Sequence, residues 1–262
     1  MLKTRIVTAV VSLLVLGAVL FVVPANVARA FIAIVVLAGA WEWSNFLGLS
    51  STAARVGYMA LVGVLLALFH FVIPERADIL LQIACVWWFV AFIWTFLFPT
   101  AIPIVIRWMC GVLVLLPLFV ALNILYSMQP QLLIFALLIV WAADIGAYFA
   151  GRAFGRVKLA PSISPGKTWE GVFGGLLVVA LLTTAWGYYF DLKLAVLLPF
   201  CLAVAALSIV GDLTVSMFKR TAGVKDSGKL FPGHGGVLDR IDSVSAAAPL
   251  FTLGFVALGL QA

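Results

Sequence analysis

The sequence predicts an all-α, polytopic integral membrane protein with about nine transmembrane helices and a cytoplasmic N-terminus. Of its 262 residues, 65% are hydrophobic and 10% are charged, and the mean hydropathy is +1.24. Soluble domains are usually about 45–50% apolar and about 25% charged, so this composition excludes a soluble globular fold. The apolar residues also gather in runs of about 20, which is the length that an α-helix needs to cross a bilayer.

Nine apolar runs are long enough to span a membrane, and prolines mark several of the breaks between them. Proline interrupts a helix, so it is least harmful between two helices. The prolines at these breaks are Pro24, Pro74, Pro99, Pro103 and Pro130. The first run resembles a signal peptide, but its length favours a retained signal-anchor helix. The predicted helices are 6–23, 30–47, 56–73, 79–98, 106–125, 131–150, 172–190, 194–215 and 243–260.

The basic residues lie mainly on one side of these predicted helices. With the N-terminus in the cytoplasm, thirteen Lys and Arg residues fall in inner segments, and three fall in outer loops, namely Arg29, Arg76 and Lys193. Cytoplasmic loops of membrane proteins carry an excess of Lys and Arg. The C-terminus is therefore predicted to face outward and the charged loops to face the cytoplasm. Because these cations lie in short loops, anionic lipid head groups and nucleotide phosphates are better partners than nucleic acid.

The chain changes character near residue 130. Residues 1–129 carry few charges and are interpreted as scaffold, dimer-forming or lipid-facing helices. Residues 130–262 contain nearly all the residues that suggest chemistry and are interpreted as the catalytic region. The division marks function more than a domain boundary, because helices of both halves can line one cavity.

The stretch 216–242 is the most informative part of the chain. It places five cations and three carboxylates in a glycine-rich loop between two apolar runs. Charges rarely accumulate at a membrane boundary without a ligand, and cations suit phosphate oxygens while carboxylates suit a hard metal. The stretch therefore predicts a phosphate-handling site at the membrane surface. Its charged residues are Lys219, Arg220, Lys225, Asp226, Lys229, Asp239, Arg240 and Asp242.

Asp212 lies just before this stretch, in apolar sequence. Asp212, Ser216 and Lys219 follow the i, i+4, i+7 spacing of one helix face. Asp239 and Asp242 share a face of the next helix, where stabilisation by the helix dipole is the alternative interpretation. An intramembrane carboxylate is a functional candidate by default, so Asp212 and Asp239 are predicted to hold a divalent ion.

A second cluster covers residues 162–171. Ser164 and Lys167 are candidate phosphate contacts there, and Asp144 lies inside the preceding predicted helix. Glu42 is the one acidic residue inside a helix of the first half. It could pair with Arg107 or another cation, or it could line the cavity. His234, in the glycine-rich loop, is a candidate substrate contact.

These residues resemble the signature of the phosphatidate cytidylyltransferases, also called CDP-diacylglycerol synthases. The signature runs without a gap from Ser216 to Asp242, and residues 164–171 resemble the second recurrent block of the family, with Gly166 where Lys is more common. The resemblance implies transfer of the cytidylyl group of CTP to phosphatidate, giving CDP-diacylglycerol and pyrophosphate. It also implies Mg²⁺, a second, monovalent cation such as K⁺, a bacterial-type inner membrane and a homodimer.

The resemblance also implies roles for individual residues. Asp212 and Asp239 would be the metal ligands. The catalytic residues would be Asp212, Asp239, Lys219, Arg220, Lys225 and Asp226. The substrate-binding residues would be Ser164, Lys167, Ser216, His234, Arg240 and Asp242. Asp144, well inside the predicted helix 131–150, is a further substrate-binding candidate from its position alone.

Two other functions compete with this interpretation. A CTP-dependent lipid kinase needs the same cations, but the long signature argues against it. A transporter for an anionic solute would suit Asp144 and Asp212, but the sequence has no inverted repeat. A purely structural membrane protein leaves the charge cluster unexplained.

Overall fold

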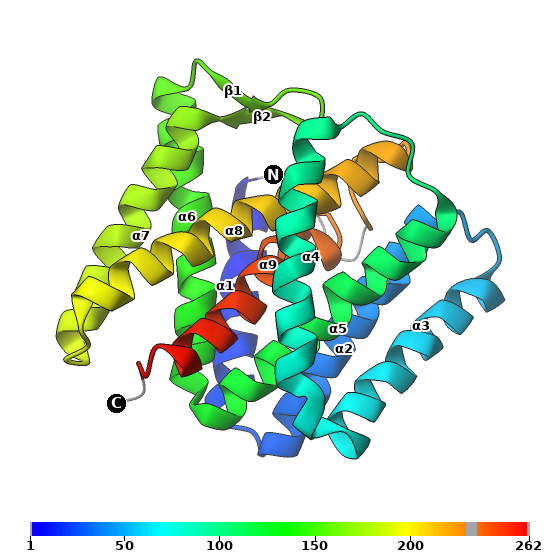
Figure 1. Cartoon of the computed structure of the whole chain (residues 1–262), viewed down its shortest axis with the longest axis horizontal. Coiled ribbons are helices and arrows are strands. Elements are labelled where there is room, and N and C mark those ends of the chain that lie inside the picture. Colours follow the sequence, from blue (N-terminus) through cyan, green and yellow to red (C-terminus); the bar gives the residue numbers. More distant parts are fainter. Residues whose placement is uncertain (1, 229–234, 261–262) are drawn as a thin grey trace.

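The chain forms a helical bundle with a small β-hairpin at one end, seen here in a computed structural model (Figure 1). The structure describes residues 2–228 and 235–260, with the side chains of residues 2–9 and 12 left out. Within these residues it contains nine α-helices: α1 Leu2–Phe21, α2 Ala25–Trp43, α3 Thr52–Ala67, α4 Ala77–Leu97, α5 Ile104–Met128, α6 Pro130–Phe154, α7 Trp169–Tyr189, α8 Leu194–Thr221 and α9 Leu238–Ala257. Short 3₁₀ or π turns lie at Ser44–Leu47, Leu68–Val72 and Pro74–Arg76.

Seven helical segments of the described chain are long and apolar enough to cross a membrane. They extend from α2 to α8, with their flanking turns included where these continue the helix. The prediction of a polytopic, helical integral membrane protein is therefore confirmed. The finer statements, nine crossing segments and a cytoplasmic N-terminus, stay predictions.

Two helices at the charged stretch are longer than the apolar runs predicted. The run 194–215 continues to Thr221, and the run 243–260 begins five residues earlier, at Leu238. Hydrophobicity marks only the apolar part of a helix, whereas the hydrogen-bonded helix continues through charged turns. Lys219 is consequently helical, and Asp239 lies in the first turn of α9.

Among the residues that the structure describes, the β-hairpin between α6 and α7 departs from the predicted all-α fold. Strand β1, Lys158–Ala160, pairs antiparallel with β2, Ser164–Thr168, and Lys158 lies opposite Thr168. The Thr168 hydroxyl accepts a hydrogen bond from the Gly171 N–H at 3.2 Å, which caps α7. The hairpin thereby fixes the position of Lys167 relative to the end of the bundle.

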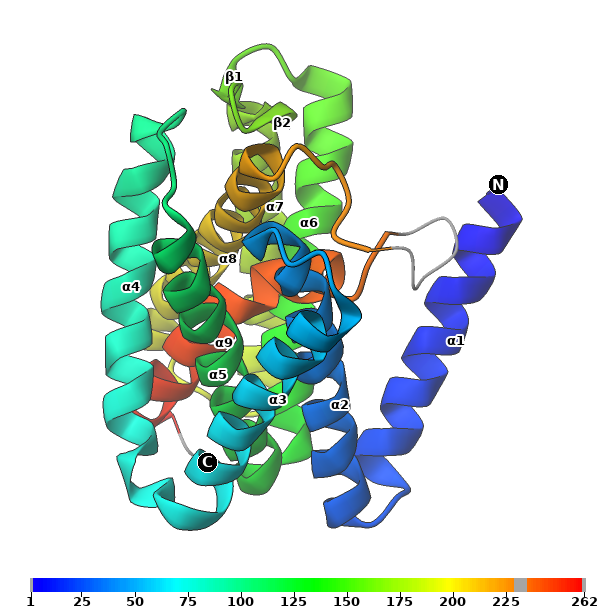
Figure 2. The same cartoon turned by 90° about the vertical axis from the view of Figure 1, so that its right-hand side faces the viewer.

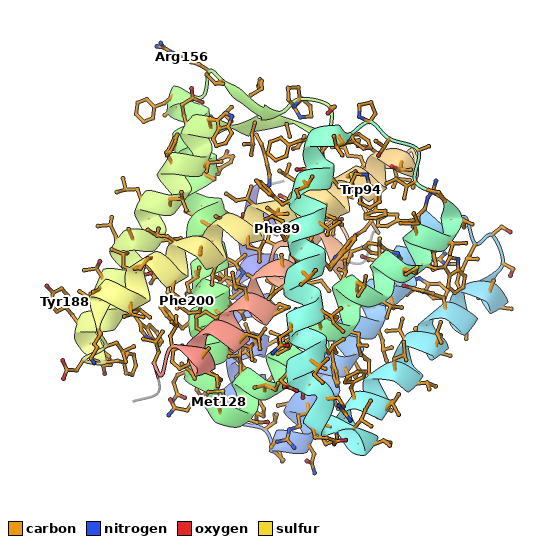
Figure 3. The ribbon with its side chains drawn as sticks, in the orientation of Figure 1. Phe89, Trp94, Met128, Arg156, Tyr188 and Phe200 are labelled. Carbon is orange, nitrogen blue, oxygen red and sulfur yellow. The ribbon has the colours of Figure 1, made fainter. Side chains whose placement is uncertain are left out.

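Helix α9 occupies the interior of the molecule, and most of its residues are buried. Helix α8 crosses the bundle obliquely beside it, while α6 and α7 stand together at one side (Figure 1). Helix α1 stands apart from the rest in the turned view, and its N-terminal end lies beside the hairpin end of the molecule (Figure 2). Arg156 and Tyr188 project outward near opposite ends of the α6–α7 pair (Figure 3).

Helices α6 and α7 approach closely because small residues line their contact. A Cβ atom on Gly175 would lie 2.6 Å from the Ala143 carbonyl oxygen, and one on Gly146 would lie 2.7 Å from the Gly174 carbonyl oxygen. Small residues let helix backbones approach in membrane proteins, where burial in lipid supplies no hydrophobic drive between helices. This packing holds the hairpin that connects the two helices.

Substitution of Gly175 by alanine tests this packing. Because the obstructing atom is a backbone oxygen, the helices must separate, and we expect Gly175→Ala to lower the free energy of unfolding by about 1–3 kcal/mol. The measurement is unfolding by SDS titration in mixed micelles, followed by tryptophan fluorescence. Gly57→Ala on α3 is the control, since a Cβ there meets nothing within 4 Å. An equal effect of both substitutions would contradict the close contact.

Candidate active site

Helix α8 presents the first part of the site on one face. The Ser216 hydroxyl donates a hydrogen bond to Asp212 Oδ1 at 3.1 Å, which agrees with their predicted i, i+4 spacing. Gly211 brings α9 against this part of α8, because a Cβ there would lie 2.5 Å from the Asp242 carbonyl oxygen. The α8 carboxylate is therefore held beside the N-terminal half of α9.

The hairpin supplies the cation that pairs with Asp212. Lys167 Nζ lies 2.6 Å from Asp212 Oδ2, and the two side chains are 25% and 27% exposed. Lys167 is part of β2, so the strand pairing determines where the ammonium group reaches α8. The structure thus joins the cluster at residues 162–171 to the carboxylate just before the signature stretch.

A second, more deeply buried ion pair links α8 to α9. Lys219 Nζ donates to Asp239 Oδ1 at 2.8 Å, and these side chains are 9% and 12% exposed. Asp239 Oδ2 accepts hydrogen bonds from the backbone N–H groups of Ser227 and Gly236, each at 2.9 Å. Burial raises the pKa of the Asp239 carboxyl, but these donors and the Lys219 charge outweigh it, so the pKa lies below its usual value.

Glu42 on α2 contacts the same loop. The sequence alone did not decide between a salt bridge and a cavity position for this residue. Its carboxylate accepts hydrogen bonds from the Ser227 hydroxyl at 2.8 Å and from the N–H groups of Val237 and Leu238 at 3.1 and 2.8 Å. Arg107, one of the partners considered for Glu42, instead donates to the carbonyl oxygens of Ile102 and Phe46. No local pattern identifies these contacts, because they join residues more than 180 positions apart.

Asp242 and Asp144 interact electrostatically with residues of the two ion pairs. Asp242 is buried, and its Oδ1 accepts a hydrogen bond from the Ser243 N–H at 2.8 Å. Asp144 is exposed on α6 and interacts electrostatically with Lys167, Asp212 and Arg240. The charges of Asp212, Asp239 and Asp242 all act on Lys219. The structure therefore gathers these predicted residues into one electrostatic cluster.

The other predicted site residues form neither of the two ion pairs. Arg220 Nε donates to the Ile163 carbonyl oxygen at 3.1 Å, which attaches the end of α8 to the hairpin turn. Ser164 begins β2 and is half-buried. Lys225 and Asp226 are exposed in the loop after α8. His234 lies outside the described residues, so its role stays a prediction.

Asp212 and Asp239 are the candidate ligands for a divalent metal. The described residues contain no group of three His, Cys, Asp or Glu side chains arranged as a metal cage. Mg²⁺, however, is commonly held by one or two carboxylates together with substrate phosphates and water. Asp212 and Asp239 offer two such carboxylates, and each already binds a lysine ammonium group at 2.6–2.8 Å. The residues present fit a metal that arrives with a polyphosphate.

The two ion pairs should differ in their contribution to stability. Removing one partner of a buried pair leaves an uncompensated charge and costs about 3–5 kcal/mol, whereas a more solvated pair contributes about 1 kcal/mol or less. We therefore expect Lys219→Met to lower the free energy of unfolding by about 3–5 kcal/mol and Lys167→Met by about 1 kcal/mol. SDS titration in mixed micelles measures both. Equal losses would show that burial does not distinguish the two pairs.

Comparison with known proteins identifies the family. The chain matches the model of the Cytidylyltransferase family over residues 3–258. A phosphatidate cytidylyltransferase of Pseudomonas aeruginosa is 45% identical over 96% of this chain and 96% of the relative. One from Haemophilus influenzae is 37% identical over 96% of this chain and 98% of the relative. One from Staphylococcus epidermidis is 46% identical over 46% of this chain and 47% of the relative. The chain therefore belongs to the cytidylyltransferase family.

Proposed function

We propose that this protein is a phosphatidate cytidylyltransferase, which converts CTP and phosphatidate to CDP-diacylglycerol and pyrophosphate. The observation that carries the proposal is the pair of lysine–aspartate contacts, Lys167–Asp212 and Lys219–Asp239, at one end of an apolar bundle. Lys167, Lys219 and Asp239 belong to the two sequence blocks that resemble this family, and Asp212 lies four residues before the second of them. The full-length similarity to proteins of that name supports the same activity.

The reaction needs charge neutralisation more than proton transfer. An anionic phosphate oxygen of phosphatidate attacks the α-phosphorus of CTP and forms a new P–O bond. The bond from the α-phosphorus to the oxygen that bridges to the β-phosphate breaks, and pyrophosphate leaves with its electron pair. Because the nucleophile is already ionised, no general base is required. Catalysis then depends on positioning and on electrostatic stabilisation of the phosphates.

The residues of the site are assigned roles accordingly. Lys167 and Lys219 neutralise phosphate charge, and Asp212 and Asp239 would hold Mg²⁺. Mg²⁺ held there would supply positive charge that offsets the charge of the phosphates and of the pyrophosphate leaving group. A monovalent cation such as K⁺ is proposed beside it on the basis of the family resemblance. The proposed substrate contacts are Ser164, Ser216, Arg220, Lys225, Asp226, His234, Arg240, Asp242 and Asp144.

The protein is an integral membrane protein, and we place it in a bacterial inner membrane with the hairpin end in the cytoplasm. The bacterial relatives support the inner membrane. The excess of Lys and Arg at the hairpin end supports the orientation, in which the N-terminus also faces the cytoplasm. CTP would reach the site from the cytoplasm and phosphatidate from the bilayer. A homodimer stays a prediction from the family resemblance.

The activity is tested with purified protein in detergent, labelled CTP, phosphatidate and Mg²⁺. We expect the cytidine label to enter lipid, with an equimolar amount of pyrophosphate and sensitivity to chelator. Formation of CDP with a phosphate moved to a lipid alcohol would identify a kinase and refute the proposal. Absence of turnover in folded, Mg²⁺-supplied protein would also refute it.

The metal assignment is tested by Asp212→Ala and Asp239→Ala. Each variant removes one of two proposed metal ligands, so we expect turnover to fall at least about 100-fold. Asp78→Ala is the matched control, because Asp78 is an exposed aspartate in the first turn of α4. Near-normal turnover of either folded site variant would remove that residue from the metal site.

The orientation is tested by labelling single cysteines in intact cells. Lys225 and Lys193 are exposed at opposite ends of the bundle and are suitable positions in a background without Cys85, Cys110 and Cys201. A membrane-impermeant maleimide should label Lys193→Cys in intact cells and Lys225→Cys only after the cells are opened. The reverse pattern would invert the proposed topology.

A further inference from the structure

Glu42 is a buried carboxylate that binds three donors from the other half of the chain. It is 5% exposed and lies in the last turn of α2. Oε2 accepts from the Ser227 hydroxyl and the Leu238 N–H, and Oε1 accepts from the Val237 N–H. Among the described residues Glu42 forms no salt bridge, so neutral donors and the N-terminus of α9 stabilise it.

These donors lie on both sides of the glycine-rich loop. Ser227 precedes residues 229–234 in the sequence, and Val237 and Leu238 follow them. Asn45, three residues after Glu42, donates through Nδ2 to the Ser227 carbonyl oxygen at 3.1 Å. The end of α2 and the turn after it therefore hold the two ends of the loop together.

Asp239 also binds backbone N–H groups on both sides of residues 229–234. Its Oδ2 accepts from the N–H groups of Ser227 and Gly236, while its Oδ1 accepts from Lys219. Glu42 and Asp239 thus share Ser227, and their other partners, Gly236 and Val237, are adjacent in the chain. Any displacement of these residues at Glu42 would therefore also displace the Ser227 and Gly236 N–H groups that orient Asp239.

Two glycines make room for Glu42. A Cβ on Gly228 would overlap Glu42 Oε1, and a Cβ on Gly236 would overlap Glu42 Oε2 and the Ser227 hydroxyl. Glycine at these signature positions is therefore required by the approach of a side chain from α2. The glycines of this stretch thus leave the space that the Glu42 carboxyl group occupies.

We infer that Glu42 is a positioning residue, which holds the ends of the signature loop and the start of α9 so that Asp239 and Lys219 face the phosphates. The inference rests on the proposed cytidylyl transfer. Both oxygens of the Glu42 side chain accept hydrogen bonds, two at Oε2 and one at Oε1. A glutamine at position 42 has nearly the same shape but replaces one oxygen with an N–H donor, so at least one backbone N–H would lose its acceptor.

The test compares Glu42→Gln with wild-type protein in lipid nanodiscs by amide hydrogen exchange. Faster exchange at Val237 and Leu238 is expected from the loss of direct bonds. The informative amides are Ser227 and Gly236, which bind Asp239 and not Glu42. We expect their exchange to accelerate about 10-fold or more, while α6 and α7 keep wild-type exchange. Wild-type protection of Ser227 and Gly236 would reduce Glu42 to a local helix cap and overturn the inference.

Turnover is measured on the same variants. Supporting residues around a metal or phosphate site typically contribute 10- to 100-fold, and we expect kcat/KM for CTP to fall by about that factor in Glu42→Gln. Glu75→Gln is the matched control, because Glu75 is exposed before α4, and it should keep wild-type turnover and exchange. Unchanged kcat/KM in folded Glu42→Gln would overturn the inference.

A milder variant covers the case in which Glu42→Gln does not fold. Ser227→Ala removes one of the three donors, so we expect a loss of about 2- to 10-fold in kcat/KM together with faster exchange at Gly236. Unchanged exchange at Gly236 in Ser227→Ala would overturn the inference. If the wild-type protein makes no CDP-diacylglycerol, the proposed function fails, while the exchange of Ser227 and Gly236 still decides the role of Glu42.

Discussion

Carboxylates withdrawn from water into an apolar helix bundle require cations or N–H donors that replace the lost hydration. In this protein Asp212 receives Lys167, Asp239 receives Lys219 and two backbone N–H groups, and Glu42 receives three neutral donors. Each contact joins different elements, so the hairpin, α2, α8, α9 and the signature loop are arranged around these carboxylates. The same arrangement leaves ammonium groups next to carboxylates at one end of the bundle, where a nucleotide polyphosphate and its metal can bind.

The local part of this architecture could be predicted from the sequence. The apolar runs predicted a polytopic helical membrane protein, and helical spacing predicted that Asp212 and Ser216 share a face, which their hydrogen bond confirms. The β-hairpin was missed because Ser164-Pro165-Gly166 has the composition of a loop, although it pairs with β1. The partners of Glu42 could not be predicted, because hydrophobic periodicity carries no information on contacts between residues 185 or more positions apart.

The predicted division near residue 130 separates a half with few charges from a half with many. It does not separate the residues that hold the site in place. Glu42 and Asn45 belong to the first half, yet both bind the loop that carries the signature of the second half. The two halves therefore depend on each other in the described structure. Helices of the first half, which the charge pattern alone assigns to a scaffold, therefore help to position the reactive groups.

The contact between Glu42 and Ser227 also has a consequence for the order of assembly. The two residues are 185 positions apart, and a ribosome adds about 5–20 residues per second, so Glu42 enters the membrane roughly 10–40 s before its donors are synthesised. During that interval its carboxyl group has none of the three hydrogen bonds. Glu42 gains all three of these hydrogen bonds only when α9 packs against α2. The last helix to be synthesised therefore supplies two of the three hydrogen bonds of Glu42, and a chain that ends before α9 lacks them.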